Sequence, residues 1–158
     1  MSYFQIAPAR FEASVVVKAT PEQIFEVFED AHAWTVWADP ITHVEWTSPK
    51  PYGLGTTRTV TMSGGMIGEE EFIAWEPGKR MAFRFTQASM DSVEAFGEDY
   101  RVEDLGGGDV RVTWIMAMSP KGISKIFLKL TGFMMRFMQR KFMKQFKAYV
   151  ESRYGAAS

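Results

Sequence analysis

The first quarter of the chain shows a strand pattern and then a helical one. Residues 10–20 alternate apolar and polar side chains at their start and are rich in valine, which predicts a strand of about eight residues. Thr20 can cap a helix, Pro21 suits its first position, and Gln23 can complete a capping box, so a helix is predicted to begin here. Residues 30–40 predict a second short helix that stops before its closing proline.

Six strand-length segments follow between Ile41 and Met118. Glycine, proline, aspartate or serine separates them, and such short connections join antiparallel neighbours. The clearest hairpin spans residues 102–114, because three successive glycines permit positive φ between two alternating segments. With the first strand, these segments predict a seven-stranded antiparallel sheet. The six segments are 41–48, 55–63, 66–75, 81–89, 93–104 and 110–119.

After Pro120 the pattern is helical for about thirty residues. Because a step of four residues exceeds the 3.6-residue turn by about 40°, the apolar stripe of this helix winds around its axis. A flat contact cannot bury such a stripe, whereas a curved sheet or two different partners can. Gly132 indicates a bend or a close approach to the backbone. The stripe contains Ile126, Leu130, Met134, Met138, Phe142, Phe146 and Val150, flanked by Phe127, Phe133, Phe137 and Tyr149.

Length and composition narrow the class of protein. The chain has 158 residues, and we expect one domain over residues 1–158 with a core from about residue 10 to residue 152. No apolar run approaches the roughly 20 residues of a membrane-spanning helix, and no secretory signal is visible, so we expect a cytoplasmic protein. Cysteine is absent, which excludes disulfides, thiolate metal sites and cysteine nucleophiles.

The net charge of −1 conceals an uneven distribution. Residues 121–153 contain nine lysines and arginines against the single acid Glu151, so the rest of the chain has nine basic and eighteen acidic residues. Such asymmetry occurs in proteins that bind nucleic acids or membranes, and also where a basic helix docks on its own acidic domain. We favour the intramolecular interpretation, which predicts no nucleic-acid partner and leaves membrane contact as the less favoured alternative.

Several motifs occur together in an order that resembles a known superfamily. The segment 19–46 resembles the polyketide cyclase/dehydrase-like branch of the START-like (SRPBCC) superfamily. "GLGTTRTV", "EPGKRMAFRF" and "GGGDVRVTW" resemble its Gly-x-x-Arg strand, its proline turn and its glycine-rich hairpin. The resemblance covers about residue 10 to residue 152. The matching positions of the first segment are Thr20, Pro21, Glu22, Ile24, Phe25, Asp30, Trp34, Trp37 and Pro40.

This resemblance implies an α+β helix-grip fold. The seven-stranded antiparallel sheet would wrap around the long C-terminal helix, with two short helices between strands 1 and 2 and a cavity between sheet and helix. The apolar stripe, including Ile123 and Met138, would close the cavity, and Phe142, Phe146, Tyr149 and Val150 would pack toward the short helices. The expected ligand-binding residues are Phe83, Phe85, Phe96, Tyr100, Trp114, Met116, Ile126, Phe127, Leu130, Phe133, Met134 and Phe137.

Candidates for chemistry are few. His43 and Glu45 share one strand face but have no further ligand, so no metal is expected, and no motif indicates a cofactor. Phe96, Glu98 and Tyr100 also share a face. Turned inward, Glu98 and Tyr100 would be an acid/base pair with a raised carboxyl pKa; a Glu98 at the cavity mouth or an exposed edge is the favoured alternative. Alternation places Arg84 outward, although it remains a candidate to orient a ligand.

These features predict a protein, monomeric or homodimeric, that binds a hydrophobic small molecule such as a lipid-like compound or a polyketide. Methionine supports this hypothesis, because its flexible side chain adapts to irregular apolar guests. Two alternatives use the same cavity. One is an enzyme of the cyclase/dehydratase type, and the other is a membrane-peripheral carrier of a lipid or quinone.

Overall fold

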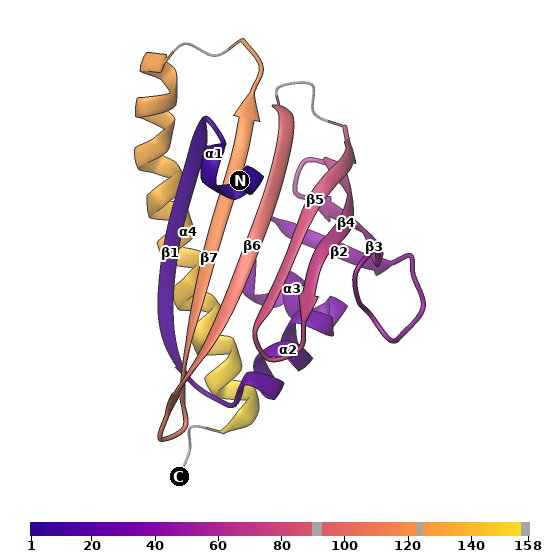
Figure 1. Cartoon of the computed structure of the whole chain (residues 1–158), viewed down its shortest axis with the longest axis vertical. Coiled ribbons are helices and arrows are strands. Elements are labelled where there is room, and N and C mark those ends of the chain that lie inside the picture. Colours follow the sequence, from indigo (N-terminus) through magenta and orange to yellow (C-terminus); the bar gives the residue numbers. More distant parts are fainter. Residues whose placement is uncertain (90–92, 123–124, 156–158) are drawn as a thin grey trace.

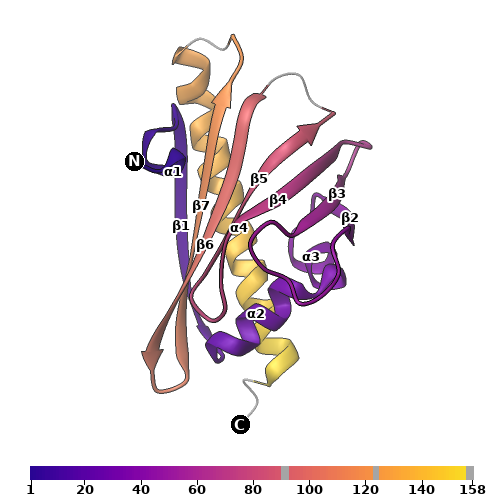
Figure 2. The ribbon, with the colours of Figure 1, turned by 45° about the vertical axis from the view of Figure 1, so that its right-hand side comes forward.

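A computed structural model describes residues 1–89, 93–122 and 125–155. These residues form one curved, seven-stranded antiparallel sheet in the order β1-β7-β6-β5-β4-β3-β2 (Figures 1 and 2). The predicted sheet and all seven of its strands are therefore confirmed. The strands are β1 (Ala9–Lys18), β2 (Ile41–Trp46), β3 (Thr57–Met62), β4 (Ile67–Glu76), β5 (Arg80–Ala88), β6 (Val93–Gly106) and β7 (Asp109–Pro120).

The helices α2 (Pro21–Glu29), α3 (Ala31–Trp37) and α4 (Lys125–Tyr154) are also as expected. The Thr20 hydroxyl accepts a hydrogen bond from the Gln23 backbone N–H, and the Gln23 side chain accepts one from the Thr20 N–H, which completes the capping box. The sequence analysis missed α1 (Tyr3–Ile6), a four-residue helix that buries Phe4 against β6 and β7. Within the described part of the chain, no helix combines the length and apolar character needed to cross a membrane.

Helix α4 packs along β1 on the face of the sheet opposite α1 (Figure 1). A Cβ on Gly132 would lie 3.5 Å from the Phe11 ring, which confirms the predicted close approach. Further along the helix, the Phe146 ring packs against Trp37 and Phe28. The lower half of the molecule thus has a continuous aromatic core, and the long helix closes it.

The basic C-terminal part of α4 docks on acidic residues from the start of the chain. Arg153 pairs with Asp30, and Lys141 pairs with Asp39 at 3.1 Å. The intramolecular docking expected from the charge distribution therefore exists for this half of the helix. In the parts of the chain that the structure describes, no ion pair comes from α4 before Lys141.

Candidate functional site

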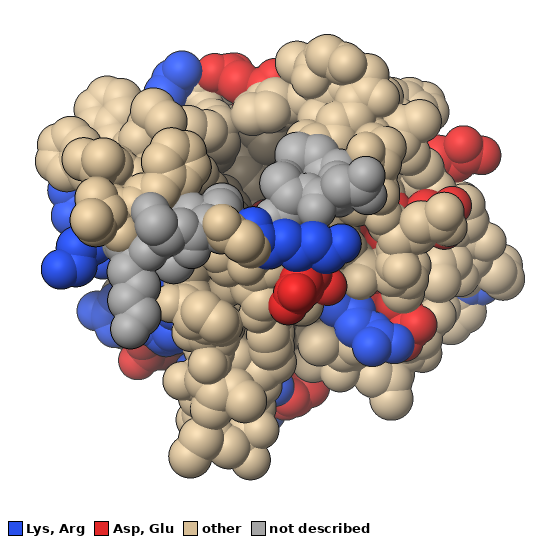
Figure 3. All heavy atoms as spheres, turned by 90° about the horizontal axis from the view of Figure 1, so that it is seen from above, with Lys and Arg blue, Asp and Glu red and all other residues tan. Residues whose placement is uncertain are grey.

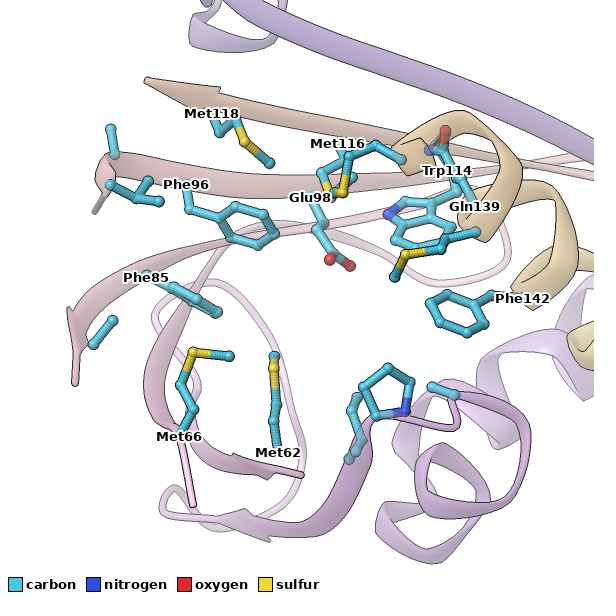
Figure 4. Close-up of a pocket in the computed structure, with 18 of the residues that line it drawn as sticks. Met62, Met66, Phe85, Phe96, Glu98, Trp114, Met116, Met118, Gln139 and Phe142 are labelled. Atoms are coloured by element: carbon cyan, nitrogen blue, oxygen red, sulfur yellow. Dashed lines mark hydrogen bonds between the residues drawn. The ribbon is translucent and has the colours of Figure 1, made fainter. Parts of the chain in front are cut away.

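A cavity of about 600 Å³ lies between the concave face of the sheet and α3 and α4. Figure 4 shows its lining side chains converging from β5, β6 and β7, from α4, and from the turn between β3 and β4. Cavities of this size hold drug-sized molecules. Most of its walls are aromatic rings or methionines: Trp34, Trp37, Met62, Met66, Phe85, Phe96, Tyr100, Trp114, Met116, Met118, Met135, Met138 and Phe142.

The register of β6 and β7 explains why one set of side chains lines this cavity. Antiparallel partners in a sheet point to the same face, and residues two apart on a strand share that face. The inward set from β6 and β7 therefore forms a two-column wall. Its directly opposed pairs are Phe96 and Met118, Glu98 and Met116, and Tyr100 and Trp114.

Glu98 places a carboxyl group inside this apolar space. Its side chain points into the cavity (Figure 4), and the Tyr100 hydroxyl donates a 2.8 Å hydrogen bond to its Oε2. Burial, reinforced by the nearby Glu70 carboxylate, raises the pKa of Glu98 to about 8, although the Tyr100 hydroxyl, Arg58 and the Trp114 indole all favour the charged form. Glu98 is therefore mostly protonated at neutral pH, so it can both donate and accept hydrogen bonds.

Three further polar atoms belong to cavity-lining residues. The Trp37 indole nitrogen and the Gln139 Oε1 are buried and make no hydrogen bond with another described residue, whereas the buried Trp114 indole nitrogen interacts with Glu98 and lowers its pKa. Figure 4 shows the Trp114 nitrogen on the side of the ring nearer to Glu98. The Gln139 amide nitrogen donates to the Phe11 and Trp114 carbonyls, which fixes its orientation. All three atoms have almost no accessible surface, so they lie within the cavity wall and not at its open space.

A buried ion pair supports the site from the side of β3 and β4. Arg58 and Glu70 face each other across these strands, and their side chains are only 1% and 3% exposed. The Arg58 guanidinium also lies 4.3 Å from the centre of the Trp34 ring and 4.8 Å from that of Phe83. Burial raises the pKa of Glu70, and the Arg58 guanidinium limits the rise. Both members of the pair act on Glu98: the Glu70 carboxylate raises its pKa, and the Arg58 guanidinium lowers it.

The structure brings the predicted strand residues together. Phe85, Phe96, Tyr100, Trp114 and Met116 all line the cavity, as expected. Phe83 points to the same side of the sheet but is enclosed in the core, between the rings of Phe72 and Tyr100, and does not line the cavity.

The interpretation of α4 was wrong for six residues. Ile126, Phe127, Leu130, Phe133, Met134 and Phe137 lie on the outer surface, and the exposed fractions of Phe133 and Leu130 are 78% and 70%. Met138 does line the cavity, together with Met135, Gln139 and Phe142. Phe142 was expected to pack toward the short helices, as Phe146 does. Ile123 lies outside the described residues.

The contact between α4 and β1 explains this rotation. Gly132 is the position where the helix meets Phe11, and Gln139 is anchored to the backbones of β1 and β7. At about 100° per residue, both positions lie on the side of the helix opposite the Ile126, Leu130 and Phe137 side chains. The inward face of α4 is thus the one that contains a glycine and a glutamine. The position of the apolar stripe does not predict this face.

Glu98 corrects a second expectation. The favoured interpretation placed it at the cavity mouth or an exposed edge, whereas its carboxyl lies inside the cavity. Arg84 faces outward, as its alternation with two phenylalanines predicts, and lies 3.6 Å from Glu71. Arg84 is therefore too far from the cavity side of the sheet to orient a ligand. His43 and Glu45 are exposed, and no three potential metal ligands cluster among the described residues.

The analysis of the sequence assigned no role to the Arg58–Glu70 pair. The signal for it was the hairpin made by residues 57–76, because its short turn fixes which residues oppose each other. In that register Arg58 lies on the same, inward face of β3 as the buried Val60. On the neighbouring strand, its direct partner is Glu70. An arginine and a glutamate directly opposed on a buried face predict a buried ion pair.

Comparison with known proteins identifies relatives of this chain by sequence and by structure. An uncharacterized protein of Mycobacterium tuberculosis is 46% identical over 157 residues, which cover 99% of this chain and 93% of that protein. The Zhui aromatase/cyclase from Streptomyces has a TM-score of 0.74 at 14% identity, over 95% of this chain and 98% of that one. A START superfamily protein from Mycobacterium smegmatis has a TM-score of 0.69 at 12% identity, over 94% and 99%.

The likeness to these two solved structures shows the helix-grip fold. The family assignment comes from the sequence profile described as "Polyketide cyclase / dehydrase and lipid transport", which matches residues 8–151. That match contains the whole sheet and all of α4 that contributes to the cavity. The chain belongs to the polyketide cyclase/dehydrase and lipid transport family.

Proposed function

We propose that this protein binds a hydrophobic small molecule in the cavity between the sheet and α4, with a polar group of the ligand at Glu98. The observation that carries the proposal is the Glu98 carboxyl, which points into a largely apolar space of about 600 Å³. Apolar burial would supply most of the affinity, at roughly 25 cal/mol per Å² of surface removed from water. The Glu98 carboxyl favours a ligand that has an oxygen on an otherwise apolar skeleton.

Two adjacent methionines of α4 offer a matched test. Met135 lines the cavity, whereas Met134, about 100° further around the helix, is 57% exposed and does not line it. Met135→Trp fills part of the space and is expected to weaken binding of the neutral fluorophore N-phenyl-1-naphthylamine by about tenfold or more, because the ligand loses apolar contact area. Met134→Trp is expected to bind the fluorophore like the wild type in the same titration.

Two results would contradict the binding site. One is equal affinity of the wild type and both variants, which would place the fluorophore outside the cavity. The other is a loss of binding in Met134→Trp alone, which would place it on the outer face of α4. Native mass spectrometry of the wild-type protein, purified from its own host, then shows whether a hydrophobic molecule copurifies with the protein.

A second candidate function is catalysis of a cyclisation with loss of water. The observation that favours it is the hydrogen-bonded Glu98–Tyr100 pair, since a carboxyl with a pKa of about 8 exchanges protons near neutral pH. As a carboxylate, Glu98 would take a proton from a carbon beside a ketone, and that carbon would bond to a second carbonyl carbon of the same molecule. As an acid, Glu98 would then return this proton to the resulting alkoxide, which gives a hydroxyl. Glu98 would next take the second proton from the same carbon and pass it to the hydroxyl, which leaves as water as a carbon–carbon double bond forms.

The enzymatic candidate predicts that Glu98→Gln abolishes turnover and retains affinity. A linear poly-β-ketone thioester is incubated with wild type, with Glu98→Gln and with buffer, and products that have lost water are measured by mass spectrometry. We expect such products with the wild type only, while N-phenyl-1-naphthylamine binds both proteins within about threefold. Equal product in all three samples would exclude catalysis of this reaction and leave the binding function intact.

A further inference from the structure

We propose that the outward face of the first half of α4 docks this protein on an anionic membrane surface. We call the six exposed residues Ile126, Phe127, Leu130, Phe133, Met134 and Phe137 the docking face. Four of them are at least two-thirds exposed: Ile126 at 73%, Leu130 at 70%, Phe133 at 78% and Phe137 at 67%. A lipid interface would cover these side chains, which the protein itself leaves in water.

The six side chains form one continuous stripe. At about 100° per residue they fall within an arc of about 120° on the helix surface. Other exposed apolar residues, such as Val36, Leu54 and Leu105, come from separate elements and lie singly. Scattered residues of that kind are usual on soluble proteins, whereas a large contiguous apolar patch indicates an interaction surface.

The charges around the stripe indicate which partner covers it. No acidic residue occurs between Lys121 and Val150. Lys129, Arg136 and Arg140 are exposed and follow one edge of the stripe, at angles within about 40° of one another. None of the three forms an ion pair with any residue that the structure describes. An apolar face that is rich in phenylalanine and bordered by unpaired cations is typical of a helix lying in the headgroup region of an anionic membrane.

A second copy of the chain fits this surface less well. Two copies that met antiparallel through the docking face would bring their cationic edges together, with no acidic residue on either helix segment to neutralise them. Like charges oppose such an association, particularly at low salt. An anionic lipid surface offers both the apolar phase and the opposite charge.

The location of the docking face agrees with this role. Met135 and Met138 line the cavity, and their sequence neighbours Met134 and Phe137 belong to the docking face, so the two surfaces lie on adjoining sides of α4. Lys121, just before the helix, also lines the cavity. Figure 3 shows the surface from the end where α4 begins. It has a hollow there, and the uncharged residues beside the hollow are bordered by basic residues. Docking would bring that hollow close to the acyl chains; this consequence rests on the proposed function, but docking itself does not.

Sedimentation with vesicles tests the proposal. We expect the wild type to bind vesicles of phosphatidylglycerol and phosphatidylcholine at low salt and to bind pure phosphatidylcholine much more weakly. Phe133→Ser/Phe137→Ser is expected to lower the partition coefficient by about tenfold or more, since both rings lose their apolar contact with lipid. Leu54→Ser is the matched control, because Leu54 is also 78% exposed, and it is expected to bind as the wild type does.

A charge variant separates the electrostatic contribution. Lys129→Gln/Arg140→Gln is expected to weaken binding to the anionic vesicles by about fivefold per charge removed. Wild-type protein that stays in the supernatant at low salt would overturn the proposal. So would analytical ultracentrifugation that shows a wild-type dimer, a monomeric Phe133→Ser/Phe137→Ser variant and no vesicle binding by either. Met135→Trp should bind vesicles like the wild type, so failure of docking is distinguishable from failure of the cavity to bind a ligand.

Discussion

Replacing Arg58 by methionine is expected to lower the free energy of unfolding by about 3 to 5 kcal/mol. The substitution leaves Glu70, whose side chain is 3% exposed, without its ion-pair partner in the interior. It also removes the guanidinium that lies against the Trp34 and Phe83 rings. A buried carboxyl that loses the cation paired with it must become protonated or admit water, and both outcomes destabilise the folded state.

A double-mutant cycle measured by urea denaturation checks this expectation. Arg58→Met/Glu70→Met should be destabilised by much less than the sum of the two single changes, because no charge is then left buried. Arg84→Met is the matched control on β5, since Arg84 is mostly exposed beside Glu71 and such pairs contribute less than about 1 kcal/mol. A loss below about 1 kcal/mol for Arg58→Met would show that the pair is not important for stability.

Replacing Glu98 by glutamine is expected to change how stability depends on pH. The folded state raises the pKa of Glu98 from 4.5 to about 8, so it holds this proton more tightly than the unfolded chain. The stability that this proton contributes is complete below pH 4.5 and is lost as the pH rises through about 8. Glutamine keeps the shape of the protonated acid and cannot ionise. The variant should therefore gain stability relative to the wild type as the pH increases.

The expected size of this relative gain is about 2 kcal/mol between about pH 5 and about pH 9. Full conversion of the pKa shift would give more, but Glu98 is only half-buried, and solvent that enters the cavity can screen its charge. Urea denaturation of both proteins at the two pH values measures it. Glu45→Gln, on the exposed face of β2, is the control for the loss of a surface carboxyl. Parallel pH profiles for wild type and Glu98→Gln would contradict the raised pKa.

Local signals explain why the fold could be predicted from the sequence. The Thr20 cap, the glycine turn at residues 106–108 and the alternation of the strands depend on neighbouring residues, so each can be recognised without the rest of the molecule. The same alternation placed Phe85 on the inward face of its strand and grouped Phe96 with Tyr100 on one face of β6. The short helix α1 was missed because its stability depends on Phe4, which packs against residues more than 70 positions away.

The rotation of α4 could not be predicted, because it depends on contacts with distant strands. The first half of the apolar stripe, residues 126–137, faces outward, because the sheet contacts the side that contains Gly132 and Gln139. Similarly, the position of Glu98 depends on which face of β6 turns toward α4, and alternation alone is consistent with either face. Both errors concern the choice between faces of an element whose existence was predicted correctly.

Six methionines line the cavity: Met62, Met66, Met116, Met118, Met135 and Met138. Each is unbranched and can exchange rotamers at low energy, so this wall can change its outline to match a guest. Isomers that differ only in the curvature of their carbon skeleton should then have similar affinities. Discrimination among compounds would instead depend on where their oxygens lie relative to the Glu98 carboxyl and the Trp114 indole. These two groups are less adaptable than the methionines of the cavity wall.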